Sequence, residues 1–380
     1  MGSGNKQLSV VLFGSYDAGL HPRVAVLRDG LEANGKDVRE LNAPLGLTTA
    51  DKVAAASSAR RAIGFLLATA RSWMKLIRHR RGIGRPDVVV VGYLGHLDVH
   101  LAALLFPRSV VVLDYLVGLS DTMRDRGLGR SWLQRLLGAA DRAATARADL
   151  VVVDTSHHRE TLPAAARHKA VVVPVGATSE WAPIEPVYRS GALRVVFFGL
   201  YTPLQGAPVI GKAISLLAGR DDIRFTMVGS GQDLDRTKQA ASGSPNVEWL
   251  DWVDSRELPA LVAGHDVCLG IFDTGDKAMR VVPTKVYQGL AAGCAVVTGD
   301  TPAARSDLDG AAVLVEPGNP EALADTLADL CDDHEALVAA RAAAETRSAR
   351  FAPAPATKIL AYRLGELVPG SSEPVEPLTS

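Results

Sequence analysis

The chain has 380 residues, of which 47% are hydrophobic and 22% are charged, and its formal net charge is −1. This balance is typical of a folded protein of two or three domains, and it excludes a disordered or a fibrous chain. No apolar run reaches the roughly 18 residues that span a bilayer, and the three cysteines form no CxxC pair, so a membrane span, a disulfide framework and a zinc knuckle are not expected.

The first half of the chain alternates apolar strands with helical segments. The first strand is expected at residues 8–13 (LSVVLF), and a helix begins near Pro22 and ends near Gly35. Further strands are expected at residues 38–41, 87–91, 109–113, 150–153 and 170–173. Because these runs are continuously hydrophobic, they are typical of parallel strands that helices cover on both faces.

The alternation of strands and helices stops near residue 174 and restarts near residue 193. Residues 174–186 hold three prolines and no hydrophobic period, which indicates a linker between two domains. Strands follow at residues 193–198, 223–228, 247–250, 267–271, 295–298 and 312–315, with helices at 208–217, 284–292 and 320–331. The sequence therefore predicts an α/β protein with two facing Rossmann-like, doubly wound parallel-sheet domains, residues 1–185 and 186–345.

The two halves differ in charge. Residues 1–185 carry 24 Lys and Arg against 17 Asp and Glu, whereas residues 186–380 carry 17 against 25. Basic residues are not interleaved with aromatic ones, so no nucleic-acid partner is expected. Open parallel sheets bind ligands beyond the carboxyl ends of their strands. Two such domains that face each other would hold two substrates in one cleft, which favours group transfer.

The stretch from residue 266 to residue 300 is the richest in chemistry. A buried strand leads into a polar loop with Lys277 and Arg280, and Pro283, Thr284 and Lys285 then begin a helix. Free N–H groups and the helix dipole attract an anion to such a helix N-terminus, and nearby cations add to that attraction. We therefore expect a phosphate or diphosphate site there; a solvated basic loop is the alternative.

Five segments of the second half resemble, in this order, the retaining glycosyltransferases of the GT-B fold, in the large family 4 group. They are LRVVFFGLYTPLQGAPVIGKAISLL (193–217), FTMVGSGQ (225–232), VEWLDWVDSRELPALVAGHDVCLGIF (247–272), PTKVYQGLAAGCAVVTGD (283–300) and residues 313–327. The N-terminal half resembles the family more loosely. The resemblance implies a donor-binding domain at 186–345, an acceptor-binding domain at 1–185 and a C-terminal helix at 346–365 that packs back on the N-terminal domain. The composition of residues 366–380 predicts a disordered tail.

The chain departs from the family pattern around the donor. The family usually has two Glu separated by seven residues, and here Arg280 and Gln288 stand at those positions. Gln288 can still bond a ribose diol, whereas Arg280 accepts no hydrogen bond, so the contact to the donor sugar must differ. The loop at residues 199–206 lacks the cations that the family often has there. Lys277, Arg280 and Lys285 are therefore expected to neutralise the diphosphate.

Strand ends and the resemblance together supply the candidate site residues. The catalytic candidates are Asp114, His96, Arg280 and Lys285. The donor-binding candidates are Gly14, Ser15, Arg23, Gly199, Tyr201, Thr202, Gln205, Gly229, Gly231, Trp252, Val253, Lys277, Val282, Thr284 and Gln288. Asp114 and His96 are expected on the acceptor side of the cleft, with Asp114 as a proton acceptor or, alternatively, a structural carboxylate. The resemblance implies that no bound metal is needed, and His96, Asp98 and His100 lack a further zinc ligand. No cofactor is expected either, and a nucleoside diphosphate sugar is expected as co-substrate.

Residues 60–85 hold eight Lys and Arg and no Asp or Glu. Apolar side chains recur there at helical spacing, at Ile63, Leu66, Leu67, Ala70, Trp73, Met74 and Ile77. We expect a core helix with a charged outer face; the alternative is a helix that lies on an anionic membrane. The N-terminus shows no apolar signal segment, so the protein is expected in the cytoplasm, at most peripheral at the inner membrane face.

The leading hypothesis is a metal-independent, retaining hexosyltransferase that uses a nucleoside diphosphate sugar. Its acceptor would be a small molecule or lipid-linked, in bacterial envelope-glycan or specialised-metabolite synthesis. One alternative is a nucleotide-sugar epimerase or a pseudo-glycosyltransferase on the same fold. Another is a catalytically inactive subunit that binds sugar nucleotides, which the missing Glu pair suggests.

Overall fold

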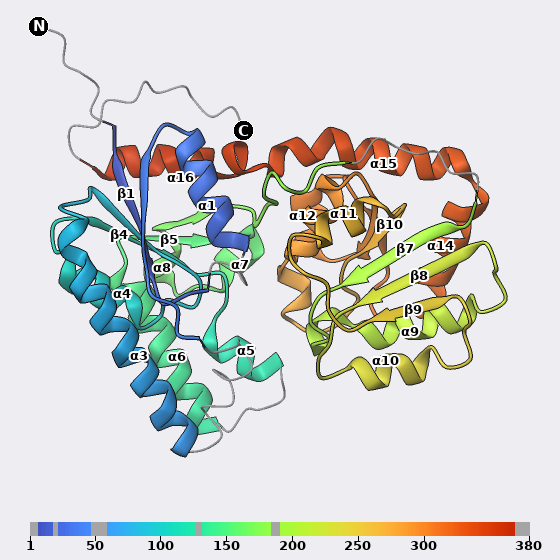
Figure 1. Cartoon of the computed structure of the whole chain (residues 1–380), viewed down its shortest axis with the longest axis horizontal. Coiled ribbons are helices and arrows are strands. Elements are labelled where there is room, and N and C mark those ends of the chain that lie inside the picture. Colours follow the sequence, from blue (N-terminus) through green and yellow to red (C-terminus); the bar gives the residue numbers. More distant parts are fainter. Residues whose placement is uncertain (1–6, 18–21, 47–58, 126–130, 184–190, 369–380) are drawn as a thin grey trace, which may run out of the picture.

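The computed structural model describes residues 7–17, 22–46, 59–125, 131–183 and 191–368. Within these ranges the chain forms two α/β domains that lie next to each other (Figure 1). Each strand expected from the sequence is present, with its ends shifted by at most two residues. The predicted fold class is therefore confirmed.

The N-terminal domain is built on a parallel sheet of order β2-β1-β3-β4-β5-β6. Its strands are β1 (Ser9–Gly14), β2 (Asp37–Asn42), β3 (Val88–Val91), β4 (Val110–Asp114), β5 (Leu150–Val153) and β6 (Ala170–Val172). Its helices are α1 (Pro22–Ala33), α3 (Ala59–His79), α4 (Asp98–Leu105), α5 (Leu119–Asp125), α6 (Ser131–Arg147), α7 (Ser156–Thr161) and α8 (Ala164–Arg167). The central strands consist almost wholly of Val and Leu because an apolar core lies on each face of the sheet.

The C-terminal domain repeats this architecture with the order β12-β11-β10-β7-β8-β9. Its strands are β7 (Leu193–Phe198), β8 (Ile223–Val228), β9 (Val247–Leu250), β10 (Val267–Leu269), β11 (Ala295–Gly299) and β12 (Val313–Val315). Its helices are α9 (Ala207–Leu216), α10 (Leu234–Ala240), α11 (Leu258–Ala263), α12 (Thr284–Ala291), α13 (Pro302–Leu308), α14 (Pro320–Asp332) and α15 (His334–Ser348). The strand order reverses between β7 and β10, and the carboxyl edge at such a reversal is where these sheets bind ligands.

The last helix returns to the N-terminal domain. Figure 1 shows α15 along the C-terminal domain and α16 (Pro353–Leu367) along the N-terminal one. Helix α16 packs closely on α1, since a Cβ atom on Gly30 would lie 2.2 Å from the carbonyl oxygen of Pro353. Asn34 Nδ2 donates a hydrogen bond of 2.8 Å to the carbonyl oxygen of Ala354. The helix continues to Leu367, beyond the boundary at 365 expected from the sequence, and residues 369–380 lie outside the described ranges.

Helix α3 differs from the core helix that its sequence predicts. Five of its large apolar side chains are exposed, and its described buried side chains are Thr69, Ser72 and Leu76. The inward face is held by polar contacts, because Ser72 Oγ donates to the carbonyl oxygen of Ala43 and Trp73 Nε1 donates to Asp98 Oδ1 at 2.7 Å. Among the described helices, none combines the length and the hydropathy that a bilayer span requires.

Candidate functional site

A cleft of about 910 Å³ lies between the two domains. Its C-terminal wall consists of the loops after β7, β8 and β9 and the start of α12, and its N-terminal wall includes residues that follow β3, β4 and β5. Many of the candidate residues line this one cavity: Arg23, Gly199, Thr202, Gln205, Gly229, Trp252, Val253, Lys277, Val282, Thr284, Lys285 and Gln288. The carboxyl edges of the two sheets therefore meet where the sequence expects ligands.

Lys285 is a buried cation on the C-terminal wall of this cleft. It lies in the first turn of α12, is only 6% exposed, and its Nζ has no hydrogen-bond partner among the described residues. The Nζ atom sits 3.6 Å from the centre of the Phe197 ring. Burial lowers the pKa of this ammonium from 10.5 to about 7. An unpartnered cation at a helix N-terminus forms a ready anion site, because charge and dipole both favour a bound anion.

Two glycines let the loops of the C-terminal domain close around Lys285. Gly199 follows β7 with φ +128° and Gly229 follows β8 with φ +116°. A Cβ atom on Gly229 would lie 2.1 Å from the carbonyl oxygen of Gly199, which is impossible without a shift of the backbone. A Cβ atom on Gly199 would lie 3.4 Å from Lys285 Nζ. The missing side chains therefore let the β8 loop pack on the β7 loop, and the β7 loop pack directly against the ammonium.

Some donor-binding candidates do not line the cleft. Tyr201 is fully buried and packs edge-on against Phe197, with ring centres 5.2 Å apart. A Cβ atom on Gly231 would lie 2.7 Å from the backbone nitrogen of Tyr201. The backbone N–H and Oγ of Ser15, next to Gly14, donate to Asp98 Oδ2 at 2.7 and 2.8 Å. These four candidates support the loops behind the cleft instead of lining it.

The expected position of Asp114 on the acceptor side is corrected by the structure. Its side chain is 0% exposed and accepts hydrogen bonds from Arg23 Nε and Nη2 at 3.2 and 3.3 Å. Burial raises the pKa of the Asp114 carboxyl, and the Arg23 guanidinium acts against this rise. Arg23 also donates to the carbonyl oxygen of Pro174. Asp114 is thus a structural carboxylate that positions Arg23, the residue that reaches the cleft.

His96 is likewise not among the residues that line the cleft. It is 4% exposed, and its Nε2 lies 3.1 Å from Asp141 Oδ1. Asp141 also accepts hydrogen bonds from the backbone N–H of Leu119 and from Ser120 Oγ, at the start of α5. Burial acts to raise the pKa of the Asp141 carboxyl, but the bonds from His96 and Ser120 outweigh it and hold that pKa below its usual value. Asp141 therefore orders the start of α5, and the buried His96 ring lies against Asp141.

Arg280 bridges the two domains and does not join Lys285. Its Nη2 donates to Asp121 Oδ2 of α5 at 2.7 Å, and Thr155 Oγ1 donates to its carbonyl oxygen. It lines a smaller cavity of about 310 Å³ together with Tyr115, Asp121 and Asp141. The expectation that Arg280 neutralises the same phosphates as Lys285 is corrected, because its charge is already paired across the domain interface.

Two features of the cleft were not expected from the sequence. Asp154 lines it directly after β5, is 3% exposed, and has its Oδ1 2.6 Å from His158 Nδ1. The strand-end position of Asp154 matches that of Asp114, so the same signal could have found it. The N-terminal wall is also rich in apolar side chains, including Leu116, Val117, Leu119, Met123 and Leu137. Four of them lie within residues 116–123, and Leu137 reaches the same wall from α6.

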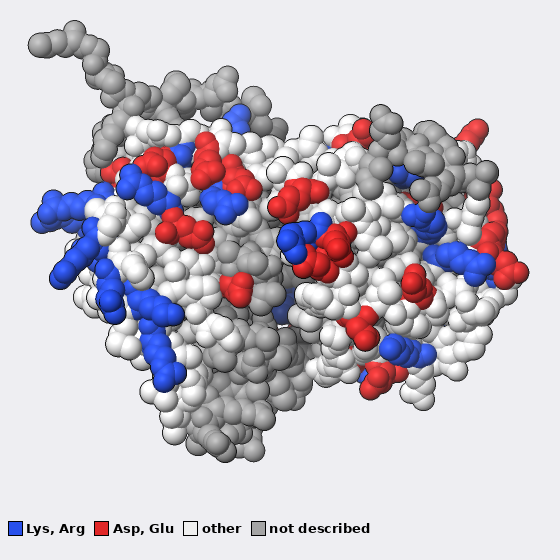
Figure 2. Space-filling model, viewed as in Figure 1, with Lys and Arg blue, Asp and Glu red and all other residues white. Residues whose placement is uncertain are grey.

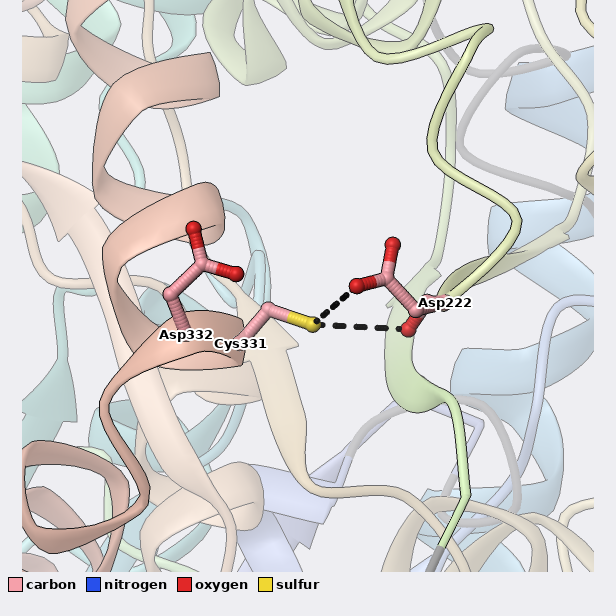
Figure 3. Close-up of side chains that lie close together, drawn as sticks. All are labelled: Asp222, Cys331 and Asp332. Carbon is pink, nitrogen blue, oxygen red and sulfur yellow. Dashed lines mark hydrogen bonds between the residues drawn. The ribbon is translucent and has the colours of Figure 1, made fainter.

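One group of described residues could hold a metal ion, and it is not among the residues that line the cleft. Figure 3 shows the Cys331 thiol pointing toward Asp222, with Asp332 beside it on α14. Arg220 already pairs with both carboxylates, at 2.8 Å from Asp222 Oδ1 and 2.5 Å from Asp332 Oδ1. The guanidinium therefore already balances the charge of both carboxylates. His96 and Asp98 bind separate partners, Asp141 for the former and Ser15 and Trp73 for the latter.

Comparison with known proteins identifies the architecture. Residues 192–333 match the family model described as "Glycosyl transferases group 1". Similar solved structures include sucrose-phosphate synthase from Thermosynechococcus elongatus (14% identity, 95% of this chain and 98% of that chain, TM-score 0.66) and Anabaena HepE in complex with UDP-glucose (16%, 95% and 100%, TM-score 0.65). A glycosyltransferase from Rickettsia africae is also similar (15%, 97% and 100%, TM-score 0.60). A search of curated proteins found no match. The chain has the GT-B fold, and its C-terminal domain carries the group 1 sequence pattern.

Proposed function

We propose that the protein is a glycosyltransferase that moves a sugar from a nucleoside diphosphate sugar to an acceptor. The observation that carries this proposal is Lys285, a buried ammonium at a helix N-terminus in the cleft between two GT-B domains, which has no hydrogen-bond partner among the described residues. The group 1 pattern of residues 192–333 supports the transferase class. The HepE structure with UDP-glucose, which shares the fold, supports the donor class.

The donor lies along the C-terminal wall of the cleft. Its diphosphate binds between Lys285, the free N–H groups of α12 and the Gly199 loop. Gln288 lies about one helical turn after Thr284 and lines the same cleft, so it faces the ribose hydroxyls. Trp252 is 67% exposed at the cleft and offers a flat surface on which a nucleobase stacks.

Lys285 stabilises the diphosphate as it leaves the sugar. In a transfer with retention, the bond between the sugar C1 and the diphosphate oxygen opens, positive charge builds on the sugar and negative charge builds on the departing diphosphate. A preorganised ammonium and a helix dipole bind that growing negative charge more tightly than they bind the ground state. The acceptor oxygen bonds to C1 from the same face, and its proton passes to the departing phosphate oxygen. This route requires neither a protein nucleophile nor a metal.

The acceptor lies along the N-terminal wall. The apolar side chains of Leu116, Val117, Met123 and Leu137 there fit an acceptor with an apolar portion, such as a lipid-linked one. Asp154 is the buried carboxylate on this side of the cleft, and its bond to His158 holds it in place. It is suited to orient the acceptor hydroxyl as a hydrogen-bond acceptor.

The test is incubation of the full chain with a panel of nucleotide sugars and candidate acceptors, read by mass spectrometry. Free nucleoside diphosphate together with an acceptor heavier by one sugar is the expected result. An isomerised donor would instead indicate an epimerase on this fold. Donor binding without any turnover would indicate an inactive sugar-nucleotide-binding subunit.

A further inference from the structure

Helix α3 (Ala59–His79) turns its apolar side to solvent. The α3 apolar face consists of Ile63, Leu66, Leu67, Met74 and Ile77, which are between 47% and 61% exposed. The opposite side of the helix buries the hydroxyl groups of Thr69 and Ser72. A helix that packs on a core shows the reverse pattern. An apolar surface of this kind in a folded protein marks a site of interaction.

The orientation of α3 is fixed by specific contacts. Ser72 Oγ donates to the carbonyl oxygen of Ala43, and Trp73 Nε1 donates to Asp98 Oδ1 at 2.7 Å. Leu76 lies on the same inward side and belongs to the core of the N-terminal domain. A rotation of the helix that buried the apolar face would break these contacts. The exposure of the α3 apolar face is therefore fixed by the contacts of the helix with the rest of the domain.

Cations border the α3 apolar face along one side. Arg71, Lys75 and Arg78 are exposed, and the 3.6-residue period places all three on the same flank of the helix. The sequence from residue 59 to residue 86 contains no Asp or Glu. Figure 2 shows blue side chains gathered along the edge of the N-terminal domain where α3 lies in Figure 1.

This arrangement selects one kind of partner. Two copies of the chain that met through the α3 apolar face would bring their cations together, and like charges in contact disfavour such a pair. A bilayer with anionic headgroups is complementary to both the α3 apolar face and its flanking cations. The apolar side chains enter the acyl boundary, while the cations contact lipid phosphates. We infer that the α3 apolar face docks the protein on the surface of an anionic lipid bilayer. This docking is separate from sugar transfer and is measured without donor or acceptor.

The test is sedimentation of the full chain with lipid vesicles. One set consists of phosphatidylcholine, and the other contains one quarter phosphatidylglycerol. We expect binding to the anionic vesicles and much weaker binding to the neutral ones. Leu66→Ser should lower the partition coefficient about tenfold, because one buried leucine is lost from the bilayer. The triple variant Arg71→Gln, Lys75→Gln, Arg78→Gln should lower it about fivefold for each cation.

Matched variants on the other domain serve as controls. Leu216 is 56% exposed on α9, and Lys212 is exposed on the same helix, so Leu216→Ser and Lys212→Gln should bind like the wild type. All variants should melt at the wild-type temperature, since the altered side chains are on the surface. Equal binding of Leu66→Ser and wild type, or no wild-type binding to anionic vesicles, would overturn the inference. A dimer in vesicle-free solution that Leu66→Ser dissociates, without any vesicle binding, would overturn it in favour of a second copy.

Discussion

Replacing Lys285 by methionine should raise the stability of the folded protein and lower its affinity for the nucleotide-sugar donor. Methionine keeps much of the length of the side chain and removes the ammonium. The folded protein holds that ammonium buried on the Phe197 ring with its pKa lowered to about 7, whereas an unfolded chain gives it the ordinary value of 10.5. Because the folded state binds this proton more weakly, Lys285 destabilises the protein fully below about pH 7. The penalty falls as the pH rises from 7 to 10.5.

The size of the effect follows from the two pKa values. A fall from 10.5 to about 7 corresponds to an upper bound of about 5 kcal/mol in the free energy of unfolding. Relaxation and water entry reduce such penalties, so we expect Lys285→Met to stabilise the protein by roughly 2 kcal/mol at pH 6. That gain corresponds to a rise in Tm of roughly 5 °C. The gain should be smaller at pH 9.5.

Donor affinity should move in the opposite direction. Removing one preorganised charge at the diphosphate costs about 3 kcal/mol, so Lys285→Met should slow turnover by roughly 10²- to 10³-fold and weaken donor binding. Thermal melting at both pH values and titration calorimetry with the preferred nucleotide sugar measure the two effects. Lys212→Met, an exposed lysine on α9, should change neither quantity. A Lys285→Met protein with unchanged donor affinity and turnover, or one destabilised equally at pH 6 and pH 9.5, would refute the reasoning.

Three further predictions concern the N-terminal wall and the chemistry. Asp154→Asn should slow turnover by roughly 10²-fold while calorimetry shows unchanged donor affinity, and wild-type turnover would remove Asp154 from the reaction. Asp114→Asn should lower the free energy of unfolding by about 3 kcal/mol in denaturant titrations, because Arg23 then remains buried without a charged partner. A fully stable Asp114→Asn protein would show that this ion pair is not structural. Excess EDTA should leave the rate of transfer unchanged, since Lys285 and the α12 dipole supply the positive charge, and a loss restored by manganese would contradict this.

The strands and part of the lining of the cleft were predictable from local sequence. Runs such as LVVV at β5 can be buried on both faces only in a covered parallel sheet, so the fold class followed from composition and order. Thr284 and Lys285 were expected at this edge because Pro283 begins a helix directly after the loop of a buried strand, whereas Gln288 was expected from the family resemblance. In each case the signal lies within one short segment, where spacing alone decides which groups share a face.

What only the tertiary structure decided is the direction of each polar side chain and the partner it meets. Asp114 and Asp154 end neighbouring strands in the same way, but Arg23, 91 positions from Asp114, draws that carboxylate inward while Asp154 lines the cleft. Arg280 pairs with Asp121, which lies 159 positions away, and so does not join Lys285. The period of α3 showed an amphipathic helix, yet which side meets the sheet depended on Ala43 and Asp98. Contacts between residues so far apart in the chain leave no local pattern, because they exist only once the sheet has brought their segments together.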